Sequence, residues 1–301
     1  MPILKKEDVT PRRPVILMIY GQAGSGKTSV ATTANNPVII DTDKGYDRSV
    51  QRVDTLIATK WEDVIAEQKA GTFDNYGTIV LDTVKGCTDD YLQVYVLAQD
   101  YKLQRNALKR FGAMSDHFKS FVNFLRSKGC DIIFIAHDKE TQDGDLIKHS
   151  PDCTGQSKDL LIRIADEVGY LFVENGERKI SFNPDETHVG KNVADLPVVT
   201  IPKAGSAEFT DFMANLIEKV KDGIQNKSEA NRMANKLVSE LREQLKSAQT
   251  EEDIENLIKG MQSLPKGLQV PFFNDMKENL SQKGYTYHSK EKKFTKNEQS
   301  Q

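Results

Sequence analysis

Cysteine and long apolar runs are both scarce in this sequence. Its three cysteines, Cys87, Cys130 and Cys153, are far apart and odd in number, which argues against a disulfide framework or a zinc site and suits a reducing compartment. No apolar run approaches the roughly 18 residues that a membrane-spanning helix needs. The first residues contain neither a long apolar core nor a small-residue cleavage site, so we infer no secretory signal. We therefore expect a cytoplasmic protein with no membrane partner.

A strong excess of charge of one sign is also missing. The net charge is −3, so the molecule as a whole lacks the basic balance typical of nucleic-acid binding, and any such surface must be a local basic patch. Hydrophobic residues make up 38% and charged residues 28% of the chain, which fits a folded globular protein. The length of 301 residues allows one large α/β domain and a smaller appendage.

Five short apolar runs predict strands that alternate with helical segments. These strands are expected at 14–20, 37–41, 55–59, 78–82 and 131–137. Such alternation favours parallel pairing in an open twisted sheet. Beyond these runs, short strands with an Asn175-Gly176 turn are typical of hairpins, and the chain after Pro202 looks wholly helical. The predicted fold is α/β: a mostly parallel sheet extended by antiparallel strands and followed by a small helical C-terminal region.

The pattern also predicts where the domains begin and end. We expect an N-terminal segment at 1–13, a core at 14–203, a helical region at 204–287 and a disordered tail at 288–301, because the last residues are polar.

Four helix boundaries are predicted from capping residues and proline. Ser115 and Gly129 are expected to begin and end the helix before the fifth strand. Ser228 is expected to precede a new helix, and Pro271 to lie in a first helical turn.

The stretch "IYGQAGSGKTSVATTA" carries the strongest functional signal. Gly21, Gly26, Lys27 and Thr28 satisfy the pattern G-x-x-x-x-G-K-[ST], between a predicted strand and a helix-compatible stretch. Glycines let successive amides point at phosphate oxygens, the lysine reaches the outer phosphates, and the hydroxyl of Thr28 holds Mg²⁺. The pattern therefore predicts ATP and Mg²⁺ as cofactors. The expected nucleotide contacts are Gly21, Gln22, Ala23, Gly24, Ser25, Gly26, Lys27, Thr28 and Ser29.

Polar residues at the ends of later strands are candidates to complete the site. Asp82 ends the fourth strand and would hold Mg²⁺ directly or through water; alternatively it only forms a turn. Asp43 is the expected general base, and Asp41 is a structural residue or an indirect magnesium contact, unless both only form the turn before Gly45. His137 ends the fifth strand and would sense the γ-phosphate, or else it caps the following loop.

In this order, the motifs "GQAGSGKT", "VIIDTDKG", "TIVLDTV", "IIFIAHDKE" and "TGQSKDLLIRIADEVGYLFVE" resemble the RecA-like core, over residues 14 to about 202. More narrowly, "DTDKGYDRS", "FGAMSDHFKSFVNFL" and "HVGKNVADLP" look like phage-encoded nucleotide-binding proteins, some of which are single-strand annealing recombinases. The resemblance implies a phage protein at work in a bacterial cytoplasm.

The resemblance also implies roles for individual residues. In RecA-like proteins a glutamate stands where this chain has the shorter Asp43, and a glutamine sensor where it has His137. Residues 138–155 match the mobile DNA-binding loop by position. Lys191 lies where a basic residue completes the ATP site of the next subunit, or it is only a solvated lysine.

Two basic stretches are the expected contacts with single-stranded DNA. Basic groups and aromatic rings bind such strands by charge and by stacking. The alternative is a solvated helix face and an acidic loop without DNA contact. The candidate residues are Lys102, Arg105, Lys109, Arg110, Lys148 and His149.

Two functions remain open from the sequence. One is a RecA-like phage ATPase that forms a homo-oligomer, a filament or a ring, on single-stranded DNA and promotes annealing or strand pairing. The other is a nucleotide-gated binding module with negligible hydrolysis that recruits a replication or packaging partner. Apolar residues at helical spacing after residue 204 predict either a self-packed helical subdomain or a docking module for a single-strand binding protein.

Overall fold

The computed structural model describes residues 3, 5, 8–49, 51–289 and 291–297. The chain divides into two compact units. One, here called the core unit, is Arg12–Ile224; the other, the C-terminal unit, comprises Gln225–Gln301 together with Met1–Pro11.

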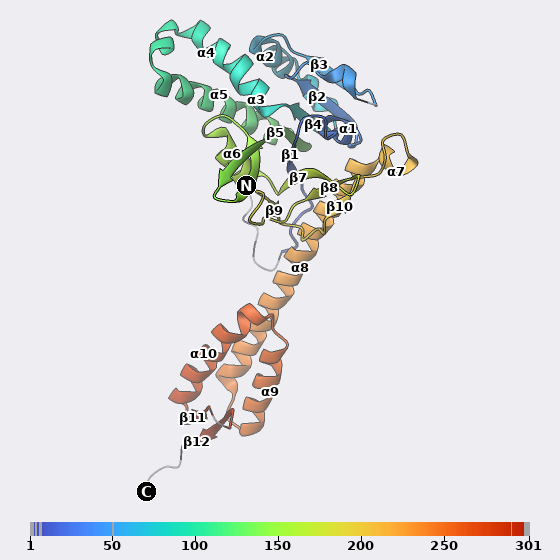
Figure 1. Ribbon diagram of the computed structural model, residues 1–301. Coiled ribbons are helices and arrows are strands. Elements are labelled where there is room, and N and C mark those ends of the chain that lie inside the picture. Colours follow the sequence, from blue (N-terminus) through green and yellow to red (C-terminus); the bar gives the residue numbers. More distant parts are fainter. Residues whose placement is uncertain (1–2, 4, 6–7, 50, 290, 298–301) are drawn as a thin grey trace. The chain divides into compact units, whose positions relative to one another are not determined.

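The core unit is built on a large twisted sheet (Figure 1). Its strands run in the order β10-β8-β7-β1-β5-β4-β2-β3, with β6 paired to β5 and β9 to β7. The strands from β3 to β7 in this order are parallel, and β6, β8, β9 and β10 are antiparallel to their neighbours. The strands are β1 (Ile16–Gly21), β2 (Pro37–Asp41), β3 (Asp54–Ile57), β4 (Thr78–Asp82), β5 (Asp131–Asp143), β6 (Leu146–Asp152), β7 (Glu167–Glu174), β8 (Glu177–Ser181), β9 (Lys191–Asn192) and β10 (Val199–Thr200).

This sheet confirms the predicted fold class. All five predicted parallel strands are present, and β5 lies between β1 and β4, so consecutive strands of the chain are not always neighbours in the sheet. The turn between β7 and β8 has positive φ at both Asn175 and Gly176, as the Asn-Gly pair predicts.

Helices cover both faces of the sheet because alternate strand residues point to opposite faces. Met18 and Tyr20 pack into one apolar cluster with α2 and α5, while Leu17 and Ile19 pack into another with α1 and the start of α8. The helical segments are α1 (Lys27–Ala31), η1 (Tyr46–Arg48), α2 (Trp61–Ala70), η2 (Thr72–Asn75), α3 (Val84–Gly86), the π-helix η3 (Cys87–Leu92), α4 (Gln93–Gln99), η4 (Tyr101–Arg105), α5 (Ala107–Ser127), α6 (Ser157–Ile164), α7 (Ala207–Thr210) and α8 (Phe212–Ser247).

Two boundaries in the core unit differ from the predictions. Helix α5 begins at Ala107, where the Asn106 side chain accepts a hydrogen bond from the Lys109 amide, and Ser115 is a buried residue inside the helix. The predicted end of the core at residue 203 precedes α7, whereas the unit extends into α8. The reason is packing: the first turns of α8 bury apolar side chains against the sheet, namely Met213, Leu216, Ile217 and Val220.

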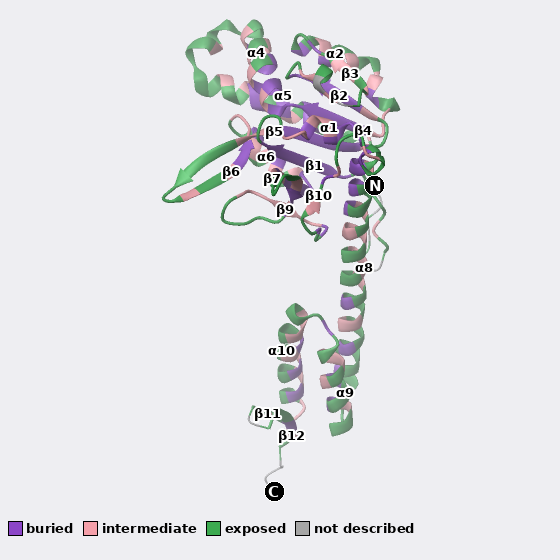
Figure 2. Cartoon of the chain, turned by 45° about the vertical axis from the view of Figure 1, so that its right-hand side comes forward, coloured by how far each residue is buried: buried purple, intermediate pink, exposed green. Residues whose placement is uncertain are grey.

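Residues 138–152 form a regular hairpin rather than an irregular loop. Strand β5 continues six residues past His137 and pairs with β6 from His137↔Asp152 to Asp143↔Leu146. Gly144, with φ of 64°, makes the turn. Figure 2 shows the outer part of this hairpin exposed, beyond the buried strands of the sheet.

The C-terminal unit contains the rest of α8, then α9 (Glu251–Gln262), α10 (Lys266–Gln282) and a hairpin of β11 (Tyr285–His288) and β12 (Lys293–Lys296). Its core includes Leu241, Leu257 and Phe272.

Three expectations fail in the C-terminal unit. Ser228 lies inside the continuous helix α8, where its hydroxyl contacts that of Thr10, and Pro271 lies inside α10. Strand β12 occupies part of the range 288–301 that was predicted to be disordered, because Phe294 packs with Phe273 and Tyr287. Residues 298–301 lie outside the described residues. Among the helices that are described, none combines the length and apolar character of a membrane span.

Candidate nucleotide site

The glycines of the loop between β1 and α1 answer two different steric demands. Gly24 and Gly26 have φ of 75° and 93°, a region that residues with a side chain rarely adopt. Gly21 has another reason: a Cβ there would lie 2.3 Å from the carbonyl oxygen of Leu171 on β7. The loop is therefore shaped by both turn geometry and close contact with the neighbouring strand.

Lys27 folds back over this loop. Its Nζ donates to the carbonyl oxygens of Gly21 and Gln22, each at 2.8 Å, and the residue is only 6% exposed. Burial lowers the pKa of Lys27, and nearby carboxylates oppose that shift; these are Asp82, Asp138 and Asp43. The ammonium group is thus held at the mouth of the loop, where an anion would relieve its unfavourable burial.

Thr28 and Asp82 meet beside the lysine. The Thr28 hydroxyl donates to Asp82 Oδ2 at 2.5 Å. Parallel pairing places Asp82 level with Asp41 on β2, so both carboxylates reach the same edge of the sheet. Burial raises the pKa of Asp82 to about 6, although the hydrogen bond from Thr28 lowers it.

The two aspartates after β2 have different surroundings. Asp41 is 3% exposed, and its carboxylate accepts the amides of Asp43, Gly45 and Tyr46, so it fixes the turn. Asp43 instead faces the cavity, with Oδ2 3.5 Å from His137 Nε2.

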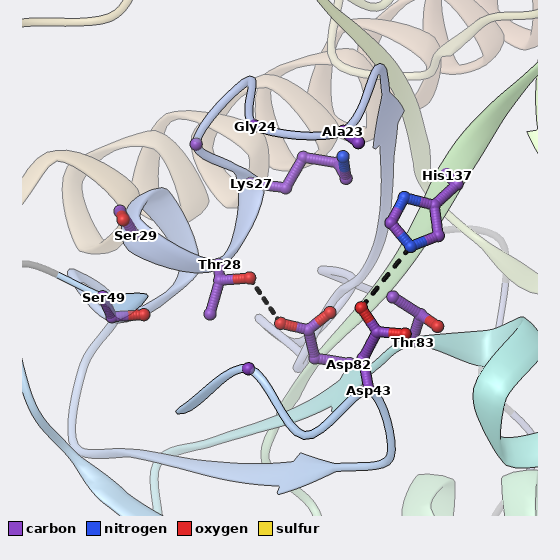
Figure 3. A pocket seen from close by; sticks show the side chains of 12 residues that line it. Ala23, Gly24, Lys27, Thr28, Ser29, Asp43, Ser49, Asp82, Thr83 and His137 are labelled. Atoms are coloured by element: carbon purple, nitrogen blue, oxygen red, sulfur yellow. Dashed lines mark hydrogen bonds and ion pairs between the residues drawn. The ribbon is translucent and has the colours of Figure 1, made fainter. Parts of the chain in front are cut away.

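These groups converge on one cavity of about 240 Å³ (Figure 3). Lys27, Thr28, Asp43, Asp82 and His137 all line it. Its remaining lining residues are Ala23, Gly24, Gly26, Ser29, Gly45, Ser49 and Thr83. The first five of these residues, predicted from four separate motifs, are thus brought together by the carboxyl ends of the parallel strands.

The donor set suits a phosphate chain and a hard cation. Phosphate prefers cationic and amide donors, here the ammonium group of Lys27 and the amides of the loop. Mg²⁺ prefers oxygen ligands, here those of Thr28 and Asp82. The hydroxyls of Ser25 and Ser49 are buried and have no hydrogen-bond partner among the described residues. Such groups need a partner, and Ser49 lines the cavity itself.

The helix after the loop is short. Helix α1 has five residues, so few aligned peptide units add to its dipole. Attraction of an anion here depends more on the loop amides and Lys27 than on the helix.

Arg178 is a neighbour of the loop that the sequence patterns do not reveal. A Cβ on Gly26 would lie 2.4 Å from Nη1 of Arg178, and Nη2 of Arg178 donates to the carbonyl of Pro202 at 3.3 Å. Arg178 lies on β8, which only the β7–β8 pairing brings close to the loop. No spacing along the chain signals that contact.

Lys191 lies in another environment than expected. Its Nζ donates to the carbonyls of Ile162, Arg163 and Ala165, at 3.3, 3.1 and 2.5 Å, at the end of α6 in its own chain. Within its own chain Lys191 therefore caps the end of that helix.

The DNA candidates fall into two separate places. Lys148 forms an exposed ion pair with Asp143 near the hairpin turn, whereas the His149 ring is bonded to Asp138 and stacked on Tyr170. The other four lie on η4 and the first turn of α5, beside the exposed rings of Tyr101 and Phe111. These four are Lys102, Arg105, Lys109 and Arg110.

The sheet order and the lysine-bearing loop define a mostly parallel α/β domain of the P-loop class. Residues 13–193 match the family described as the AAA domain, and the chain belongs to that family. No curated protein matches the chain. Among solved structures it is similar to the crystal structure of the RadB recombinase, with 14% identity and a TM-score of 0.35, over 56% of this chain and 80% of that one. The family and fold imply use of a nucleotide.

Proposed function

We propose that the protein is a Mg²⁺-dependent ATPase that acts on single-stranded DNA in phage recombination, as a homo-oligomer that promotes annealing or strand pairing. The observation that carries this proposal is the convergence of Lys27, the Thr28–Asp82 pair and the Asp43–His137 pair on one cavity. The resemblance of the ordered motifs to RecA-like phage proteins supports the biological setting.

Different residues of the chain would bind the phosphates, hold the metal and activate water in ATP hydrolysis. Bound Mg²⁺-ATP supplies the reactive phosphoanhydride and a metal charge at the phosphates. Lys27 would exchange its two carbonyl acceptors for phosphate oxygens, and Thr28 with Asp82 would hold the metal. Asp43 would orient water and take its proton.

His137 supports a link between the nucleotide and the hairpin. Its ring contacts Asp43 at 3.5 Å and it begins the paired part of the β5–β6 hairpin. Exchange of this contact for a phosphate oxygen would carry the state of the nucleotide to the hairpin.

The proposed DNA contact rests on exposure and charge. Tyr101 is 72% and Phe111 43% exposed, which is unusual for large rings and suits base stacking. Lys102, Arg105 and Lys109 lie between these rings in the sequence. A single-strand binding protein is a further proposed partner, through the C-terminal unit.

A second function is favoured by one observation. Asp43 carries a shorter side chain than the glutamate of RecA-like proteins and already has His137 as a partner. A module that binds ATP but hydrolyses it negligibly, and recruits a replication or packaging partner, would have such a weakened base.

The test is ATP turnover of the full chain with and without single-stranded DNA. The first function predicts stimulation by DNA and loss of turnover in Asp43→Asn with nucleotide binding retained. Flat, negligible turnover with tight ATP binding would favour the second. Normal turnover in Asp43→Asn would remove this residue from the base role.

A salt titration tests the DNA surface. The double variant Arg105→Ala/Lys109→Ala should bind single-stranded DNA more weakly and reduce the salt slope by about 1.4, at roughly 0.7 for each lost phosphate contact. Lys128→Ala, at the other end of α5 and paired with Asp74, is the matched control. An unchanged slope in the double variant would exclude this surface.

A further inference from the structure

Three metal-ligating side chains meet at the base of the β5–β6 hairpin. Asp138 and Glu140 are two residues apart on β5 and so share a face, and Glu140 is the cross-strand partner of His149 on β6. One ligand atom from each of the three residues lies within 4.8 Å of the others. His149 Nδ1 and Asp138 Oδ2 are 2.6 Å apart.

Asp138 is the residue that this packing leaves incomplete. Its side chain is only 3% exposed, yet Oδ1 has no hydrogen-bond partner in the part of the chain that the structure describes. A buried carboxylate oxygen without a partner is costly and is rare in folded proteins. A cation would supply the missing partner.

His149 is already oriented as a ligand. Its ring stacks on Tyr170 with centroids 4.9 Å apart, and its side chain is 19% exposed. A ligand whose ring is fixed before binding loses little conformational freedom.

We propose that Asp138, Glu140 and His149 bind one divalent transition-metal ion of the Zn²⁺ or Mn²⁺ class. One imidazole nitrogen and two carboxylates suit such ions better than Mg²⁺, which prefers oxygen alone. Ligand atoms about 2.0–2.2 Å from one ion lie roughly 3.4 Å apart at tetrahedral angles. The Asp138–His149 pair, at 2.6 Å, would therefore open slightly to admit the ion, and Glu140 would need only a small movement to reach it. The ion would replace the proton between Asp138 and His149.

This site is distinct from the Thr28–Asp82 pair but touches the same loop. Gln22 Nε2 donates to Glu140 Oε1 at 3.4 Å, and Asp138 directly follows His137. An ion here would fasten the hairpin at its base, next to the nucleotide cavity. Binding of the ion does not depend on the proposed ATPase function.

The experiment is calorimetric titration of the metal-stripped full chain with Zn²⁺ and Mn²⁺, without nucleotide, and the visible absorption of bound Co²⁺. One ion should bind per chain. Glu140→Gln, which changes an exposed residue, and His149→Ala should each weaken binding by at least about tenfold. Asp143→Asn, near the turn of the same hairpin, is the matched control and should bind as the parent does.

Folding is checked in each variant by the fluorescence of Trp61, the single tryptophan, which is buried in the core unit. Three outcomes would overturn the proposal. One is no uptake of Zn²⁺ or Mn²⁺ by the folded parent. Another is equal affinity for Zn²⁺ and Mn²⁺ in the folded Glu140→Gln variant and the parent. The third is loss of the ion in Asp82→Asn but not in Glu140→Gln, which would locate it at the other site.

Discussion

Replacing Asp82 by asparagine should stabilise the nucleotide-free core unit at neutral pH, although it removes a residue of the proposed metal site. Burial raises the pKa of this carboxyl from 3.8 to about 6. The folded state therefore binds more protons than the unfolded state between these values, and stability falls as the pH rises through that window. Above about pH 6 the carboxylate of Asp82 is charged in the folded state, and its burial then destabilises the fold by the full amount.

The pKa difference sets the magnitude. At about 1.4 kcal/mol per pKa unit, the ionised carboxylate destabilises the fold by about 3 kcal/mol at about pH 7.5 and by about 1 kcal/mol at about pH 4.5. Asparagine avoids this cost, and its amide oxygen still accepts the hydrogen bond from Thr28. Asp82→Asn should therefore be more stable than the parent by about 3 kcal/mol at the higher pH and by only about 1 kcal/mol at the lower pH.

The assay is urea unfolding followed by Trp61 fluorescence, which reports the core unit alone because this is the single tryptophan. The matched control is Asp41→Asn: its carboxylate accepts three backbone amides, so this variant should be destabilised by about 1–3 kcal/mol at both pH values. Addition of Mg²⁺ and ATP should stabilise the parent but not Asp82→Asn. A loss of stability in Asp82→Asn that is equal at both pH values would refute the reasoning.

Three further variants test other parts of the structure. Gly26→Ala should weaken nucleotide binding, because φ of Gly26 is 93° and the new methyl group would meet Arg178. Gly24→Ala is the control, since a methyl group there has open space and causes only backbone strain. Equal nucleotide affinity in the two variants would exclude an effect of the Arg178 contact. Lys191→Met should cost about 1–2 kcal/mol in urea unfolding and leave turnover per folded molecule unchanged, while lost turnover at parental stability would restore a role for Lys191 in catalysis. Phe118→Ala should cost about 3–5 kcal/mol in urea unfolding, and a cost below about 1 kcal/mol would contradict its place in the core.

The sequence predicts those features that depend on local pattern. Strand runs are recognisable because their residues are buried on both faces, and their carboxyl ends necessarily meet at one edge of a parallel sheet. For that reason Lys27, Asp43, Asp82 and His137, from four separate motifs, were predicted to share a site, and the structure brings all four to one cavity.

What the sequence missed depends on pairing between distant segments. Arg178 reaches the loop only through the β7–β8 pairing, and Asp138 meets His149 only through the register of the β5–β6 hairpin. Lys191 was assigned by its position along the chain, but its partners are the carbonyls that end α6. The start of α5 was misplaced because Ser115 was taken as the capping residue, whereas Asn106 caps the helix and Ser115 is buried within it.

The most direct test of the central claim is calorimetric titration of ATP into the full chain, with and without Mg²⁺, for the parent and for Lys27→Ala. The arrangement of Lys27, Thr28 and Asp82 predicts magnesium-dependent uptake of one nucleotide per chain by the parent and at least about a tenfold loss of affinity in the variant, since an ion-paired hydrogen bond contributes roughly 1.5–3 kcal/mol. Absence of uptake by the parent at millimolar ATP, or equal affinity in the two proteins, would contradict it.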